Sequence, residues 1–389
     1  MTVRALIVSH TAAMGGAEHS LLRFLDAIPP GIEPAVACPD GPLSEAVCAR
    51  GVPRFALRGT SGSLRLHPIH TTRAVAELGE MALQVQRHAR RMGAHLVHAN
   101  SVRAGLVAIG ARALGGPPVA VHVRDVLPQS RAGADTCALL RRGARTIIAI
   151  SEHVARAFGG DPAAPGTHVV MELVDPARFS PRPQDRARRA LGLPPDAPIL
   201  AVLAQITPWK GQDVAIRALA DIRRRRPDAL LLVVGEAMFA GRATRMDNRA
   251  YERDLHAFAT GLGVDGAVRF LGRRDDVPTV LAAIDVLLVP SQVEPFGLCV
   301  IEGMAMERAV VATSVGGPAE VIADGVDGRL VDPLDGVAWG EAAGELLDDV
   351  PGRAAMGAAA RRRVLDAFTP ARYGAAMARA YDATIGVAA

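Results

Sequence analysis

The sequence predicts an α/β protein with two Rossmann-like domains, each built on a parallel sheet, and two observations lead to that prediction. Short apolar runs alternate with segments of helical periodicity along the chain, which is the pattern of repeated strand–helix–strand units. This rhythm breaks once, in a Pro-, Arg- and Asp-rich stretch at residues 175–196, and then starts again. A chain of 389 residues is long enough to form two hydrophobic cores.

The two alternating sets define the expected domains. Predicted strands of the first set are residues 3–9, 34–38, 95–99, 119–123, 146–150 and 168–171, with helices at 17–28, 72–91 and 103–114. Predicted strands of the second set are 199–203, 230–234, 268–271, 285–289 and 309–313. We expect an N-terminal domain at 1–178, a linker at 179–197, a C-terminal domain at 198–368 and a last helix at 369–389. Two such domains are expected to face each other across a ligand-binding cleft.

The last helix carries apolar residues at helical spacing, namely Tyr373, Met377 and Tyr381. This stripe predicts a buried face, and packing back on the first domain is one way to bury it.

Bulk properties indicate a cytoplasmic protein. No apolar run approaches the ~18–20 residues that span a bilayer, and residues 1–8 are too short a run for a signal peptide. The four cysteines are scattered, as is usual in a reducing compartment. The acidic pairs Asp275-Asp276 and Asp348-Asp349 have simpler explanations at a helix start and in a polar loop. We therefore expect no metal site.

The net charge of +4 is concentrated in the first half of the chain. Its basic groups include Arg87, His88, Arg90, Arg91, Arg141, Arg142 and Arg145. A basic face suits a phosphorylated acceptor or the acidic inner face of a membrane, with peripheral association. The alternative is that these arginines only cap helix ends and stay solvated. No nucleic-acid partner is expected.

Lys210 is the single lysine among 44 cationic side chains. It lies in the turn 205–211, between an apolar strand and a helix. Such turns bind phosphates because free backbone N–H groups and the helix dipole point at the anion. Lysine adds a compact point charge there. The pattern favours a phosphate site, with an ordinary surface lysine as the alternative.

A second feature strengthens the phosphate interpretation. Glu294-Pro295-Phe296-Gly297-Leu298 follows a predicted strand, and Glu302 comes about one turn into the next helix. Two carboxylates on either side of amides that favour an anion suit hydroxyl groups on either side of a phosphate. This is the chemical outline of a nucleotide sugar.

Four segments, in this order, resemble the family-4 retaining glycosyltransferases, which have the GT-B fold. They are the glycine-rich loop 10–18, the Lys210-Gly211 turn, the segment from Glu294 to Glu302, and the loop 315–322. The resemblance extends over nearly the whole chain.

The resemblance implies a role for each matching residue of the second half. Lys210 would neutralise the diphosphate as it leaves, and Glu294 would hold hydroxyls of the transferred sugar. Glu302 would bind the ribose diol. The amides of Phe296, Gly297 and Leu298 would contact sugar and phosphate.

In the first half, the resemblance places Gly15 and Gly16 in a loop that approaches the donor phosphates or the acceptor. A residue with a Cβ would crowd such a loop. Many relatives also carry a histidine after a strand of this domain, near the reacting carbon. Our alignment puts Arg124 at that position, with His122 two residues earlier on the same strand face. Either is a candidate catalytic residue, and for His122 a buried strand histidine is the alternative.

The chain departs from the family pattern at two further places. Gln205 replaces an arginine that shares the phosphate charge in many relatives, so Lys210 would carry more of that charge. Glu172-Leu173-Val174-Asp175 replaces a turn with Asn-Gly, which leaves the role of this turn open.

The resemblance implies a transferase that moves a sugar from a nucleotide-diphosphate donor to a hydroxyl of a carbohydrate, a lipid-linked molecule or a natural product. Transfer would retain the anomeric configuration and need neither metal nor cofactor. Arginine and alanine enrichment suggests a bacterial source, where such enzymes build envelope glycans. A non-catalytic sugar- or nucleotide-binding protein and a nucleotide-sugar epimerase are the alternatives. The segment Met14-Gly15-Gly16-Ala17 does not match the G-x-G-x-x-G of a dehydrogenase.

Overall fold

The computed structural model describes residues 2–59, 68–128, 130–238 and 247–387. The chain forms two compact units, and each is described by itself. Unit 1 consists of Met1–Leu173 and Pro370–Ala389, and unit 2 of Val174–Thr369. Residues 179–197, expected to be a linker, lie in unit 2 and include helix α7 (Gln184–Ala190).

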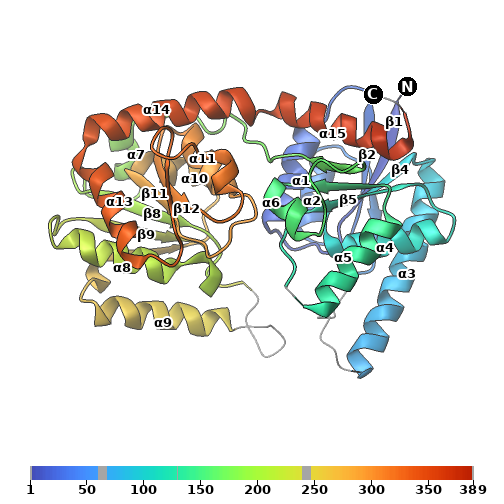
Figure 1. Ribbon diagram of the computed structural model, residues 1–389, viewed down its shortest axis with the longest axis horizontal. Helices are drawn as coiled ribbons and strands as arrows, with labels where there is room; N and C mark the ends of the chain where they lie inside the picture. Colours follow the sequence, from blue (N-terminus) through green and yellow to red (C-terminus); the bar gives the residue numbers. More distant parts are fainter. Residues whose placement is uncertain (1, 60–67, 129, 239–246, 388–389) are drawn as a thin grey trace. The chain divides into compact units, whose positions relative to one another are not determined.

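Unit 1 is built on a parallel sheet with the strand order β3-β2-β1-β4-β5-β6-β7 (Figure 1). The strands are β1 (Val3–Val8), β2 (Ile32–Cys38), β3 (Arg54–Ala56), β4 (Leu96–Ala99), β5 (Val119–Val123), β6 (Thr146–Ala149) and β7 (Thr167–Val169). The helices between them are α1 (Gly16–Asp26), α2 (Pro42–Cys48), α3 (Pro68–Met92), α4 (Val102–Ala113), α5 (Arg131–Gly143) and α6 (Glu152–Ala157).

The last helix, α15 (Pro370–Ile385), belongs to unit 1 and packs against α1, β4, β5 and β6. Tyr373, Met377 and Tyr381 are buried in the core of this unit. The Phe24 ring of α1 meets the rings of Tyr373 and Tyr381 edge-on, at centroid distances of 5.7 and 6.1 Å. Aromatic packing therefore joins the C-terminal helix to the first helix of the chain.

Unit 2 is built on a second parallel sheet with the strand order β10-β9-β8-β11-β12-β13. Its strands are β8 (Ile199–Leu203), β9 (Leu230–Val234), β10 (Val268–Gly272), β11 (Val286–Val289), β12 (Ala309–Thr313) and β13 (Arg329–Val331). Its helices after α7 are α8 (Gln212–Arg223), α9 (Asn248–Gly261), α10 (Val277–Ala283), α11 (Leu298–Ala305), α12 (Pro318–Val321), α13 (Gly336–Asp348) and α14 (Val350–Ala367).

The predicted fold class, with two α/β domains on parallel sheets, is confirmed. The central strands β9, β11 and β12 are buried along their whole length, because helices cover both faces of a parallel sheet. This burial explains their apolar sequences. The bounds of β9 and β12 agree with the prediction, and β11 begins one residue later than predicted, at Val286. The edge strands β3 and β13 were not predicted; they have three residues each and include half-buried positions.

In both sheets the chain first adds strands on one side of a central strand and later on its other side. In unit 1 the chain passes from β1 to β2 on one side and later adds β4 on the other, and in unit 2 it does the same around β8 and β11. Ligands of open parallel sheets bind beyond the carboxyl ends of the strands at such a switch point. The residues that follow β8 and β11 are therefore the first place to look for a site. No helix in the described residues is long and apolar enough to cross a membrane.

Candidate functional site

The two predicted phosphate- and sugar-binding residues of unit 2 meet at this switch point. Lys210 ends the short 3-10 helix Pro208–Lys210 that follows β8, and Glu294 lies in the loop that follows β11. Lys210 Nζ is 2.6 Å from Glu294 Oε2. The Ser291 hydroxyl donates to the same oxygen at 2.7 Å. The Lys210 side chain is 21% exposed and that of Glu294 is 9% exposed.

This ion pair fixes the carboxylate at the edge of unit 2. Because Glu294 Oε2 accepts from two donors in a largely buried position, the carboxylate is oriented and its charge is compensated. Ser291 has no counterpart in the sequence prediction. Its position three residues before Glu294, directly after the strand, was the available signal.

Two glycines allow the loops of this site to pack closely. Gly316 has φ 101° and forms an isolated parallel β-bridge with Glu294. A Cβ on Gly316 would overlap the carbonyl oxygen of Glu294, and one on Gly317 would overlap the backbone of Phe296. Gly317 N–H also donates to the Glu294 carbonyl at 2.8 Å. The predicted segments 294–302 and 315–322 therefore contact each other through their backbones.

The N-terminus of α11 lies beside this pair. Gly297 is its N-cap, with φ 92°, a left-handed conformation that favours glycine. Phe296 is buried and its ring packs edge-on to Phe368, so this residue can present its backbone but not its side chain. Within the described part of the chain, the amides of Phe296, Gly297 and Leu298 donate to no backbone acceptor. They are available to an anion, as the first turn of a helix requires.

Glu302 lies in α11 and is 8% exposed. Cys299, on the same helix, is near both carboxylates of the predicted motif. Burial, together with the charges of Glu294 and Glu302, raises the pKa of its thiol to about 12. Cys299 therefore stays a neutral thiol at physiological pH, and the charges of both glutamates act on it.

Gln205 lies in the turn after β8, where the resemblance led us to expect a partner for Lys210. Its side-chain Nε2 is buried and has no hydrogen-bond partner among the described residues. Its backbone carbonyl accepts from Gln212 Nε2 at 2.9 Å. The side-chain oxygens of Thr207 and Gln212 are likewise buried without a partner in that part of the chain. The turn thus contains several buried polar atoms that a ligand can satisfy.

His122 and Arg124 lie inside unit 1. His122 is fully buried, and the Arg124 side chain is 5% exposed. Arg124 forms an ion pair with Glu172 and donates to Ser20 Oγ at 2.6 Å and to Asn100 Oδ1 at 3.2 Å. The structure thus places Arg124 in a buried network joining β5, α1 and the segment after β7.

A chain of aromatic and imidazole groups continues this network. Arg124 Nη2 lies 3.2 Å from His122 Nδ1, which lies 3.3 Å from His98 Nε2. His98 Nδ1 is 2.6 Å from the Tyr381 hydroxyl on α15. Burial, and then the charge of Arg124, lowers the pKa of His98 to about 3 and that of His122 well below its usual value. Both imidazoles are therefore neutral at pH 7.

Most of this network was not predicted from the sequence. Glu172 was noted only as a departure from the family pattern, and its burial beside Arg124 gives that departure a structural reason. Asn100 could have been found, because it follows β4 at the switch point of the first sheet. Its Nδ2 donates to the Ala17 carbonyl at 3.1 Å, at the start of α1.

Gly15 and Gly16 lie at the start of α1, after the loop 9–14 that follows β1. Gly15 is the N-cap, and its N–H donates to Glu18 Oε2 at 3.1 Å. A Cβ on Gly15 would lie 3.2 Å from that oxygen, whereas one on Gly16 would meet nothing within 4 Å. The atoms of the protein therefore do not require glycine at position 16, and its suggested role in approaching a ligand stays a prediction. The described residues include no group of three or more His, Cys, Asp or Glu side chains placed to hold a metal ion.

Sequence comparisons with known proteins find a family match within unit 2. The model of the family "Glycosyl transferases group 1" matches residues 183–363. The chain is 38% identical over 219 residues to a D-inositol 3-phosphate glycosyltransferase of Salinispora tropica. This match covers 53% of this chain and 43% of that protein. A protein of the same name from Stackebrandtia nassauensis is 40% identical over 193 residues, or 48% and 42% of the two chains. The chain thus spans less than half the length of these curated relatives.

Solved structures match nearly the whole chain. HepE from Anabaena, crystallised with UDP and glucose, superposes with a TM-score of 0.82 at 24% identity, covering 98% of this chain and 99% of HepE. Sucrose-phosphate synthase from Thermosynechococcus elongatus superposes with a TM-score of 0.78 at 21% identity, covering 99% and 100% of the two chains. These likenesses confirm the GT-B fold. Over residues 183–363, within unit 2, the chain is similar to the group 1 glycosyl transferases.

Proposed function

We propose that the protein transfers a glycosyl group from a nucleotide-diphosphate sugar to an acceptor hydroxyl, with retention of configuration and without a metal ion. The observation that carries this proposal is the Lys210–Glu294 pair at the switch point of unit 2, beside the open amides of α11. The narrower assignment to family 4 is part of the proposal.

In this proposal, the donor diphosphate binds at the N-terminus of α11, next to Lys210. Backbone N–H groups and the helix dipole favour an anion there, and the ammonium adds a full charge. An ammonium has three N–H donors, so contact with a phosphate does not require loss of Glu294. In this position Lys210 stabilises charge on the leaving diphosphate, which is the main electrostatic demand of the reaction.

The two glutamates act as hydroxyl ligands. Glu294 is oriented by Lys210 and Ser291 toward hydroxyls of the transferred sugar, and Glu302 toward the ribose. Glycosidases that form a covalent sugar intermediate need a free carboxylate nucleophile and a separate acid. The pairing of Glu294 supports the ligand role instead. Attack then comes from the face of the leaving group, whose phosphate oxygen takes the acceptor proton.

UDP is the first nucleotide to test, because HepE was crystallised with UDP and with UDP-glucose. The acceptor class is a carbohydrate, a lipid-linked molecule or a natural product carrying a hydroxyl. The basic residues of unit 1 favour an acceptor with a phosphate or a position at the inner face of a membrane. The curated relatives match over less than half of their length, so their acceptor is not carried over to this chain.

A non-catalytic nucleotide-binding function is the second candidate. The burial of both His122 and Arg124 favours it, because neither side chain is open to a substrate at the reacting carbon. Binding alone would need the site of unit 2 and no acid or base from unit 1.

A thermal-shift screen of UDP, GDP, ADP and dTDP and their sugars separates the outcomes. We expect one nucleotide to raise the melting temperature by mass action. Glu302→Gln is the variant of the binding site, and Phe296→Ala is the control for a loss of packing. Donor turnover with excess EDTA then tests metal independence, and NMR of the product tests retention. Absence of a shift with every nucleotide at millimolar concentration would contradict the donor site. Binding without turnover of any donor would favour the second candidate.

A further inference from the structure

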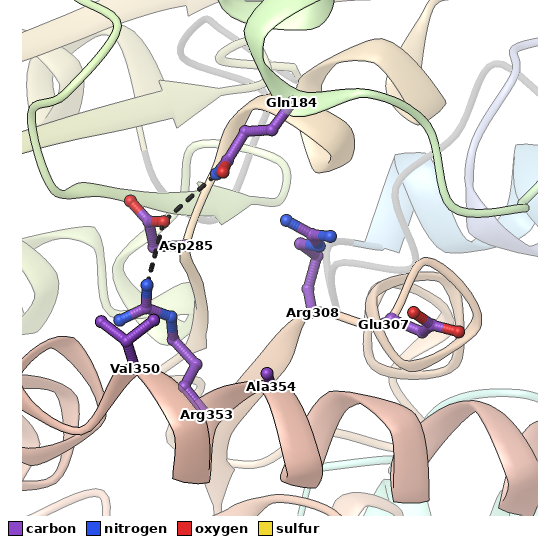
Figure 2. Close-up of a pocket in the computed structure, with 7 residues that line it drawn as sticks. All are labelled: Gln184, Asp285, Glu307, Arg308, Val350, Arg353 and Ala354. Atoms are coloured by element: carbon purple, nitrogen blue, oxygen red, sulfur yellow. Dashed lines mark hydrogen bonds and ion pairs between the residues drawn. The ribbon is translucent and has the colours of Figure 1, made fainter.

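Unit 2 contains a cavity of about 200 Å³ at the opposite edge of its sheet from Lys210. Asp285 precedes β11 and Arg308 precedes β12, and both line this cavity (Figure 2). Glu294, in contrast, follows β11. The seven residues from Asp285 to Ser291 span roughly 20 Å, at about 3.3 Å for each step from one residue to the next. The cavity is therefore separate from the proposed donor site.

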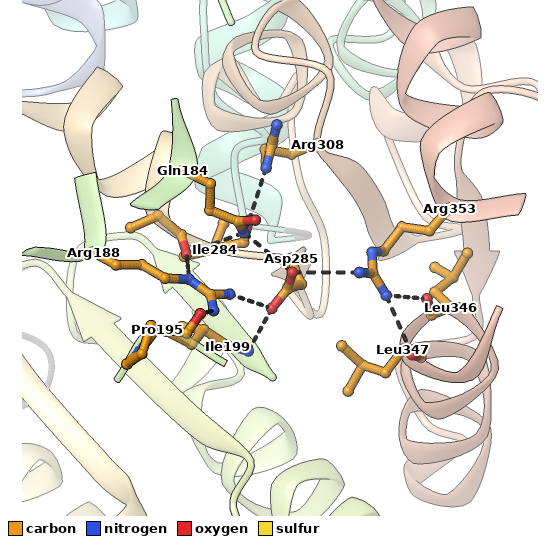
Figure 3. A network of polar contacts seen from close by, with 11 residues as sticks. Gln184, Arg188, Pro195, Ile199, Ile284, Asp285, Arg308, Leu346, Leu347 and Arg353 are labelled. Carbon is orange, nitrogen blue, oxygen red and sulfur yellow. Dashed lines mark hydrogen bonds and ion pairs between the residues drawn. The ribbon is translucent and has the colours of Figure 1, made fainter. Parts of the chain in front are cut away.

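Asp285 is fully engaged by its neighbours (Figure 3). Its Oδ2 accepts from Arg188 at 2.8 Å and from the Ile199 amide at 2.8 Å. Its Oδ1 accepts from Gln184 Nε2 at 3.1 Å and from Arg353 at 3.4 Å. A carboxylate with four donors is already compensated, so it has little left to offer another cation.

Arg308, in contrast, is held by backbone carbonyls. Its Nε donates to the Met306 carbonyl at 3.0 Å and its Nη1 to the Ile284 carbonyl at 3.1 Å. Among the described residues it forms no hydrogen bond or ion pair with an acidic side chain. Burial lowers the pKa of Arg308. The charges of Asp285 and Glu307 oppose this effect, and those of Arg353 and Arg188 add to it. A half-buried guanidinium bound only to neutral carbonyls favours an anion nearby.

The backbone holds Arg308 firmly in this position. Glu307 has φ 58°, and the amides of Glu307 and Arg308 close the C-terminus of α11 on the carbonyls of Met304 and Gly303. A Cβ on Gly357 of α14 would overlap the Glu307 carbonyl, so the turn lies directly on that helix. The carboxylate of Glu307 points away from Arg308 in Figure 2 and is 3.9 Å from Arg361. The turn thus presents the guanidinium to the cavity, whose lining also includes Glu307.

We propose that this cavity binds a phosphate group, either as inorganic phosphate or on a small phosphate monoester. The planar guanidinium of Arg308 matches the oxygens of a phosphate, and the Arg353 guanidinium lines the same space. Val350 and Ala354 of α14 form an apolar rim that limits the size of the ligand. The proposal does not depend on the glycosyl transfer proposed above.

The test is isothermal titration of inorganic phosphate, and separately of glycerol 3-phosphate, at fixed ionic strength. The protein carries Lys210→Gln with Glu294→Gln, so that phosphate cannot be held at the donor site by Lys210. In this background we expect one phosphate site, weakened roughly tenfold or more by Arg308→Gln and largely kept by Arg308→Lys. Binding of the monoester alone would identify the ligand as an organic phosphate.

Ala354→Glu supplies a second variant that does not remove any packed group, because Ala354 is exposed. It places a carboxylate at the cavity, so we expect it to abolish phosphate binding and to raise the melting temperature of the phosphate-free protein. The proposal is overturned if the doubly substituted background binds neither ligand. It is also overturned if Arg308→Gln and Ala354→Glu bind phosphate as tightly as their background. Donor turnover by the unsubstituted protein is unaffected by either result, so the two proposals fail separately.

Discussion

Lys210 and Glu294 are 84 positions apart in the chain, and their charged groups lie 2.6 Å from each other. Each closes the loop after one of two neighbouring strands, so the pair ties those loops together. Removing one partner leaves the other charge largely buried, which costs more than the pair itself contributes.

The pair should therefore show coupling in a double-mutant cycle. We expect Lys210→Met and Glu294→Gln each to lower the free energy of unfolding by about 1–3 kcal/mol, and the double variant by less than their sum. Urea denaturation measures all three. Additive costs would mean that the two charges do not stabilise each other in solution. Because a single variant has a lower melting temperature of its own, its nucleotide-induced shift must be measured against the same variant without nucleotide.

Arg124 should act on stability before it acts on catalysis. Arg124→Met leaves the Glu172 carboxylate, which is 3% exposed, without its cation, and should destabilise unit 1 by about 3–5 kcal/mol. Replacing both residues, by Arg124→Met with Glu172→Gln, should recover part of this loss. Denaturation followed by calorimetry gives the values. If Arg124→Met keeps wild-type stability but loses turnover, Arg124 has the catalytic role that the sequence suggested.

Acid should weaken unit 1 through its buried histidines. The pKa of His98 is lowered to about 3, so the unfolded chain binds a proton below pH 6.5 that the folded chain does not take up until about pH 3. Stability is therefore present above pH 6.5 and falls as pH decreases through this window, by about 1.4 kcal/mol per pH unit for each such histidine. We expect His98→Gln to give a shallower slope than wild type between pH 7 and 5. Equal slopes would show that His98 titrates normally.

The turn at Glu307 stores strain that a glycine would relieve. A left-handed residue with a side chain costs roughly 1–2 kcal/mol, so Glu307→Gly should raise the free energy of unfolding by up to about 1 kcal/mol after its own entropy cost. Glu307→Ala keeps the Cβ and removes the carboxylate, which makes it the matched control. Stabilisation by alanine as well as glycine would assign the effect to charge and not to backbone strain.

Close backbone contact behind the donor site should make Gly317 intolerant of a side chain. Its φ of −57° is open to any residue, so Gly317→Ala acts only through the overlap of its Cβ with Phe296. We expect the variant to fold with lower stability and to lose most of its nucleotide-induced thermal shift. Gly266→Ala, where a Cβ meets nothing within 4 Å, is the control. An unchanged shift in Gly317→Ala would separate this contact from the site.

The sequence predicted the strands and motifs that depend on local pattern. Buried central strands such as Val119–Val123 and Leu230–Val234 have unbroken apolar runs, and their bounds were found without change. The turn and loop that carry Lys210 and Glu294 were placed correctly after their strands, because each is a short connection from a strand to a helix.

Contacts between distant segments could not be predicted in the same way. Glu172 contacts Arg124 across 48 positions, and the sequence around one residue does not predict the other as its partner. The same holds for His98 and Tyr381, which are 283 positions apart. Polar residues inside apolar strands give a signal that something compensates them, but the partner is set by the topology of the sheet.

The single lysine has a practical consequence. Apart from the terminal amine, Lys210 is the sole primary amine in the chain, and about a fifth of its side chain is exposed. Reductive methylation with ¹³C-formaldehyde therefore labels one side chain, located where the donor phosphates are proposed to bind. Its methyl resonance would report occupancy of that site directly, on a protein modified elsewhere only at its terminal amine.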